Sequence, residues 1–153
     1  DGGRHLGRLL ASSEIPDGAL LLPVLPNGVP VVQGILDEWN CELAGLDVER
    51  GDGGVGTVTL PDVAGRWAVV VDDGVETGTV ARAVVGPLRE AGAIGVVLAV
   101  PVCPRETMAD LAQRYDRVIA CSTPLARRDL AWHYEEFDTI DEATARDLLR
   151  TLA

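Results

Sequence analysis

The sequence predicts an α/β fold in which helices cover both faces of a parallel β-sheet. Short, nearly continuous apolar segments alternate along the chain with segments whose apolar residues recur at helical spacing. This alternation is typical of parallel strands joined by right-handed helical crossovers. At 153 residues, the chain is long enough to form one domain, residues 1–153, around a substantial core.

In the first half of the chain, two helices and two strands follow from the spacing of apolar residues. Three leucines share one face of the first helix, and Pro30 suits the first turn of the second helix. Residues 51–57 contain four glycines in seven positions, so we expect a flexible loop there. The expected elements are helix 3–14, strand 19–25, helix 29–39 and strand 41–48.

The second half continues the alternation. Val80, Val84 and Leu88 mark the core face of one helix, and Gly92 ends it. No apolar run approaches the roughly 18 uncharged residues of a membrane span, so none is expected. The expected elements are strand 67–71, helix 79–91, strand 94–100, a helix near 106–115, strand 117–121 and helix 141–152.

The composition argues against several classes of function. A net charge of −11 argues against a nucleic-acid partner, which would need a basic surface. All 13 basic residues are arginines, which removes Schiff-base chemistry and the lysine of a phosphate-binding P-loop. The three cysteines are widely spaced and only two histidines accompany them, so no structural zinc site is expected. We expect reduced thiols in a cytoplasmic protein without a signal peptide.

The segment VVVDDGVETGT, residues 69–79, is the strongest functional signal. A buried strand ends at Asp72 and Asp73, at the edge of the sheet where ligands bind in such folds. A Gly/Thr turn then opens a helix, whose free N–H groups favour an anion. The two carboxylates suit sugar hydroxyls or a divalent cation. A simple helix cap with solvated acids is the alternative, but the doubled acid favours a sugar phosphate.

This segment resembles the phosphoribosyl-diphosphate (PRPP) binding motif of the type I phosphoribosyltransferases. PDVAGRWAVVVDD resembles the usual approach to that motif, and LPNGVPV and DVER resemble the ends of the first two strands. The resemblance covers roughly residues 19–50 and 61–152. It implies the Rossmann-like parallel-sheet core of that family, with a shortened hood over the site.

The resemblance also implies roles for individual residues. Asp72 and Asp73 would be the catalytic acids, holding the ribose hydroxyls directly or through Mg²⁺. The 5-phosphate would bind at Gly74, Val75, Glu76, Thr77, Gly78 and Thr79, and the pyrophosphate at Pro26, Asn27, Gly28 and Arg50. Trp132 and Tyr134 would border the acceptor pocket, with core closure as the alternative for these aromatic residues. His133 as a base and Arg127–Arg128 as phosphate contacts are weaker interpretations than surface positions, and Cys103 is interpreted as structural.

Three positions depart from the family pattern. Glu76 occupies a loop position usually filled by a small residue, and it either points to solvent or assists a metal. The first-strand loop lacks an arginine that relatives commonly have. Where relatives end the second strand with two basic residues, this chain has Glu49 and Arg50, so one basic residue remains. The segment GDGGVGTVTL provides the whole hood between the second strand and the PRPP motif.

Three functions fit these residues. The first is Mg²⁺-dependent transfer of 5-phosphoribosyl from PRPP to a nitrogen heterocycle or amine, with release of pyrophosphate. The second is a non-catalytic module that binds PRPP or a nucleotide, or a partner subunit of an active enzyme. The third is a hydrolase or lyase acting on a ribose phosphate. The resemblance implies a homodimer, and no membrane partner is expected.

Overall fold

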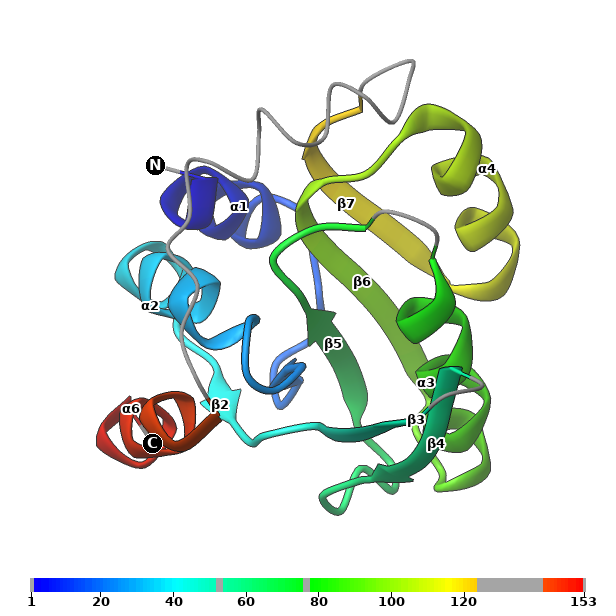
Figure 1. Ribbon diagram of the computed structural model, residues 1–153. Helices are drawn as coiled ribbons and strands as arrows, with labels where there is room; N and C mark the ends of the chain where they lie inside the picture. The colour runs from blue at the N-terminus through cyan, green and yellow to red at the C-terminus, as the bar shows by residue number, and fades with distance from the viewer. Residues whose placement is uncertain (1, 52–53, 76–77, 124–141, 153) are drawn as a thin grey trace.

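The computed structural model describes residues 2–51, 54–75, 78–123 and 142–152. Within them, five parallel strands form one sheet in the order β2-β1-β5-β6-β7 (Figure 1). The predicted five-stranded parallel sheet is therefore confirmed. Its strands are β1 Leu20–Pro23, β2 Glu42–Leu43, β5 Trp67–Val71, β6 Gly95–Val102 and β7 Arg117–Ser122.

Helices cover both faces of this sheet, because successive strand residues point to opposite sides. Leu21, Val69 and Val97 pack with α1 and α2 on one face, whereas Leu22, Val70 and Leu98 pack with α3 and α4 on the other. Figure 1 shows these two helical layers, with α6 next to α2. The helices are α1 Gly2–Ala11, α2 Val29–Glu38, α3 Thr79–Glu90, α4 Arg105–Arg114 and α6 Glu142–Leu152. None of the helices in the described residues is long and apolar enough to cross a membrane.

The predicted strand 41–48 is wrong in its extent. It divides into β2, which joins the sheet, and β3 Asp47–Gly51, which leaves it. Between them Leu46 keeps an isolated parallel bridge to Val24. The expected strand 94–100 also shifts: Ile94 is 64% exposed before β6, and the strand runs on to Val102.

The flexible loop predicted over 51–57 is also wrong. Antiparallel β3 and β4, Gly54–Thr59, form a hairpin with Val48 opposite Val58 and Asp47 opposite Thr59. The glycines suggested a loop, but valine and threonine alternate with them and have high β propensity. Val48 is buried against the core and Val58 packs on the same cluster, which fixes the hairpin beside the sheet.

Candidate functional site

The two acids follow directly from the strand at the middle of the sheet. β5 lies between β1 and β6, and it ends at Val71, so Asp72 and Asp73 emerge at the carboxyl edge. Both aspartates are half-buried. The backbone N–H of Asp73 donates to Oδ1 of Asp72 at 2.9 Å, which fixes one carboxylate against the turn. Two adjacent aspartates thus follow the strand directly, and the turn fixes the carboxylate of Asp72.

The loop after the acids is anchored at both of its ends. Val75 is buried, and its N–H donates to the carbonyl of Val102 at the end of β6. Gly78 has φ +83°, a left-handed conformation that a side chain disfavours, and it directly precedes α3. The exposed Thr79 is the first residue of that helix. The positive end of the α3 dipole therefore faces the end of this loop.

The loop over residues 26–28 lies beside the two acids. The N–H of Val24 donates to the carbonyl of Val71 at 2.8 Å, and the N–H of Gly28 donates back to the carbonyl of Val24 at 2.8 Å. A β-carbon at Gly28 would lie only 2.5 Å from the Val71 carbonyl oxygen. Pro26, which follows a cis peptide bond, and Asn27 are half-buried at the surface of this loop. The structure therefore packs the 26–28 loop against the end of β5, directly before the two aspartates.

A cleft of about 440 Å³ separates the 26–28 loop from the β3–β4 hairpin. Among the described residues, its polar side chains are two acids and two threonine hydroxyls. Asp47 forms an ion pair with Arg146 of α6 at 2.6 Å, which ties the hairpin to the last helix. Glu49 is exposed. The lining residues are Leu25, Pro26, Asp47, Val48, Glu49, Thr57 and Thr59.

Some predicted site residues lie outside the part of the chain that the structure describes. These are Glu76 and Thr77 of the phosphate loop and the aromatic residues Trp132 and Tyr134, with Arg127, Arg128 and His133 between or beside them. The backbone of Arg50 is described and pairs with Val55 in the hairpin. Its predicted role with pyrophosphate stays a prediction.

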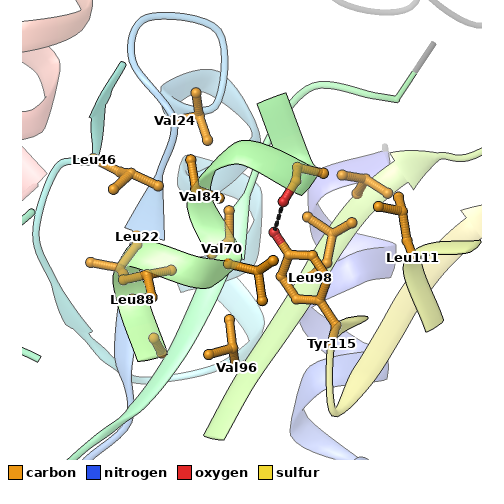
Figure 2. Packing of buried hydrophobic residues seen from close by; sticks show 14 of the residues in the cluster. Leu22, Val24, Leu46, Val70, Val84, Leu88, Val96, Leu98, Leu111 and Tyr115 are labelled. Atoms are coloured by element: carbon orange, nitrogen blue, oxygen red, sulfur yellow. Dashed lines mark hydrogen bonds between the residues drawn. The ribbon is translucent and has the colours of Figure 1, made fainter. Parts of the chain in front are cut away.

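Two residues, one in α3 and one just after α4, hold the first turn of α3, and sequence reasoning found neither. Tyr115 is 3% exposed at the edge of the core, where its hydroxyl donates to the carbonyl of Ala81 in the first turn of α3 at 2.7 Å (Figure 2). Burial raises the pKa of the Tyr115 phenol, and the nearby carboxylate of Asp72 raises it further. Arg82 forms an ion pair with Asp110 of α4 at 2.6 Å. The one feature of the sequence that could have indicated Arg82 is its position one helical turn after Gly78.

Two of the three cysteine thiols are poor candidates for nucleophiles. Cys103 is fully buried after β6, and burial raises its pKa from 9.0 to about 11. Cys41 is half-buried, and burial likewise raises its pKa to about 11. Because the thiolate is the reactive form, both thiols are unreactive near neutral pH. These observations agree with the interpretation of Cys103 as structural.

With this geometry in view, comparison with known proteins identifies the family. The profile of the phosphoribosyl transferase domain matches residues 11–133. The chain belongs to this family. Two Mycobacterium tuberculosis proteins, from strains H37Rv and CDC 1551, are provisionally named phosphoribosyl transferases and are 45% identical over 62 residues. That match covers 40% of this chain and only 14% of each mycobacterial protein.

Solved structures show that the fold is that of the type I phosphoribosyltransferases. The protein TT1426 from Thermus thermophilus superposes with a TM-score of 0.81 at 22% identity, covering 99% of this chain and 96% of its own. The purine phosphoribosyltransferase of Pyrococcus horikoshii gives a TM-score of 0.62 at 19% identity, covering 80% of each chain. A Staphylococcus aureus hypoxanthine phosphoribosyltransferase gives 0.58 at 11% identity, covering 82% of this chain and 75% of the other. Identities this low establish the fold alone.

Proposed function

We propose that this phosphoribosyltransferase-family chain transfers 5-phosphoribosyl from PRPP to a nitrogen heterocycle or amine and releases pyrophosphate. One observation carries the proposal: the 26–28 loop packs on the carbonyl of Val71, the residue directly before Asp72 and Asp73, at the carboxyl edge of the sheet. Under the proposal, a single PRPP molecule would span both loops from this edge. Its 5-phosphate would bind before α3 and its pyrophosphate would bind near Gly28.

The two aspartates fit a magnesium ion. Mg²⁺ is usually held by one or two carboxylates together with water and substrate oxygens. Asp72 and Asp73 provide that donor set, whereas the described residues contain no cluster of three or more His, Cys, Asp or Glu side chains for an all-protein site. The ion would neutralise charge on the leaving pyrophosphate.

Residues of the chain itself would bind and position the sugar. The fixed turn at Asp72–Asp73 would hold the ribose hydroxyls, and α3 would hold the 5-phosphate at its N-terminus. Holding the sugar at both ends leaves C1 exposed to an incoming nitrogen, so positioning lowers the barrier. The bond from C1 to pyrophosphate breaks with oxocarbenium character while the bond from C1 to nitrogen forms. The proton lost by the nitrogen passes to solvent or to a base.

The test is calorimetric titration with PRPP, with and without Mg²⁺, followed by a pyrophosphate-release assay with a panel of nitrogenous acceptors. The matched variant is Asp72→Asn/Asp73→Asn, which keeps the size of both side chains. We expect metal-dependent binding that the double variant loses, and pyrophosphate release that depends on one acceptor class. Absence of PRPP binding by the native chain would refute the proposal.

The second candidate is a non-catalytic module that binds PRPP or a nucleotide, or a partner subunit. The cleft beside the 26–28 loop favours it, because the exposed Glu49 places negative charge close to the proposed pyrophosphate position. PRPP binding without pyrophosphate release from any acceptor would select this candidate over the enzyme.

A further inference from the structure

The guanidinium of Arg82 lies beside Gly78, near the C-terminal end of the proposed phosphate loop. Arg82 is in the first turn of α3, and its backbone N–H donates to the carbonyl of Gly78 at 2.9 Å. Helical side chains lean toward the N-terminus, so this side chain runs back toward the loop. A β-carbon at Gly78 would lie 3.3 Å from Cζ and from one terminal nitrogen of Arg82. The guanidinium therefore occupies the space that a side chain at position 78 would fill.

Asp110 holds the guanidinium in that place. Its Oδ2 accepts from Nε of Arg82 at 2.6 Å and also lies 3.5 Å from Nε of Arg114. The hydrogen bond from Arg82 lowers the pKa of the Asp110 carboxyl, so this group stays ionised. Two guanidinium groups and one carboxylate leave the trio with a net positive charge. The methyl group of Thr107 also packs against Gly78, which closes the wall between α3 and α4.

Positive charge beside Gly78 would offset negative charge that accumulates at the proposed site. The chain carries a net charge of −11 and no lysine, and the proposed ribose site contains two aspartates. A phosphate monoester adds about one and a half to two negative charges at neutral pH. Helix N–H groups and a dipole of about half a charge offset only part of it. The net positive charge of Arg82, Asp110 and Arg114 beside Gly78 would offset part of the rest.

We propose that Arg82 balances the charge of the 5-phosphate and thereby makes the loop selective for a phosphorylated sugar. The inference rests on the proposed function, because it assumes that this loop receives the 5-phosphate. Arg82 and Asp110 are each 36% exposed in their side chains, and ion pairs this exposed contribute little to folding stability. The arginine's contribution is therefore expected in ligand affinity more than in folding.

The experiment compares Arg82→Gln, Arg82→Lys and the control Arg89→Gln. Arg89 is on the same helix and also pairs with a carboxylate, Asp116 at 3.3 Å, but at the opposite end of α3. Affinities for ribose 5-phosphate and for pyrophosphate are measured by calorimetry with Mg²⁺, and thermal unfolding monitors the fold. We expect Arg82→Gln to weaken ribose 5-phosphate binding roughly tenfold or more, since a hydrogen-bonded charge is lost. Arg82→Lys should recover most of the affinity, because the charge is kept.

Pyrophosphate affinity and the unfolding midpoint separate this role from a structural one. Under the proposal, Arg82→Gln leaves both nearly unchanged, and Arg89→Gln leaves all three readouts unchanged. The proposal is overturned if Arg82→Gln binds ribose 5-phosphate as tightly as the native chain. It is equally overturned if ribose 5-phosphate affinity falls only together with pyrophosphate affinity or stability. If the native chain binds neither PRPP nor ribose 5-phosphate, the proposed function fails first and the inference fails with it.

Discussion

Gly28 packs directly on the carbonyl oxygen of Val71, and this contact joins the two loops of the candidate site. A β-carbon at position 28 would lie 2.5 Å from that oxygen, 2.8 Å from the nitrogen of Val24 and 2.9 Å from its oxygen. All three are backbone atoms of β1 or β5 or their immediate extensions, so none can turn aside as a flexible side chain could. The absence of a side chain at Gly28 therefore sets how closely the 26–28 loop approaches Asp72.

Replacing Gly28 by alanine should weaken both the fold and the site. We expect Gly28→Ala to lower the free energy of unfolding by about 2 kcal/mol or more, because the backbone must move to admit a methyl group. Urea unfolding measures the change. Gly86→Ala is the control, since no atom lies within 4 Å of a β-carbon there, and it should be neutral or stabilising by up to about 1 kcal/mol in helix α3. Equal stability of the two variants would contradict the proposed contact.

The Tyr115 hydroxyl should stabilise the start of α3. Tyr115→Phe removes the 2.7 Å hydrogen bond to the Ala81 carbonyl while keeping the buried ring. The expected cost is about 1 kcal/mol of unfolding free energy, together with faster amide hydrogen exchange in the first turn of α3. Ser12→Ala removes a hydroxyl that donates to the Leu9 carbonyl at an exposed position, and it should change neither readout. Unaltered exchange in Tyr115→Phe would show that α3 does not depend on this bond.

The buried thiol of Cys103 should make stability fall at alkaline pH. Its pKa is raised from 9.0 to about 11, so the contribution is complete below pH 9 and is lost as the pH rises toward 11. In that window the unfolded chain has released the proton and the folded chain retains it, a slope of about −1.4 kcal/mol per pH unit. Urea unfolding under reducing conditions, between about pH 8 and pH 11, should show a shallower decline for Cys103→Ala. Parallel curves for the two proteins would exclude the thiol as a cause.

Four strands of the main sheet, β1, β5, β6 and β7, could be predicted because each contains an apolar run, whereas the two-residue β2 could not. The segment 69–79 also predicted the acids at the carboxyl edge, since a buried strand before them left no other position. The β3–β4 hairpin could not be predicted in this way. Its glycines are typical of a loop, and its strand character depends on the burial of Val48 and the packing of Val58, which are tertiary contacts.

The contacts that hold the first turn of α3 could not be predicted from the sequence either. Arg82 and Asp110 are 28 residues apart, and Tyr115 is 34 residues from Ala81. No local pattern links these pairs, because they meet only when α4 packs beside α3 on the sheet. The role of Gly28 was implied by family resemblance, and its physical reason, the lack of space beside Val71, required the structure.

The acidic cleft beside Pro26 leads to a final prediction about affinity. Glu49 is exposed in the cleft that borders the 26–28 loop, so its carboxylate opposes the negative charge of a pyrophosphate bound there. Glu49→Gln should tighten PRPP binding about twofold to threefold at low ionic strength, as expected for one solvated charge several ångströms away. The gain should shrink as salt is added. Glu90→Gln, at the far end of α3, is the control and should leave the affinity unchanged. Unchanged affinity in Glu49→Gln at low salt would place the pyrophosphate away from this cleft.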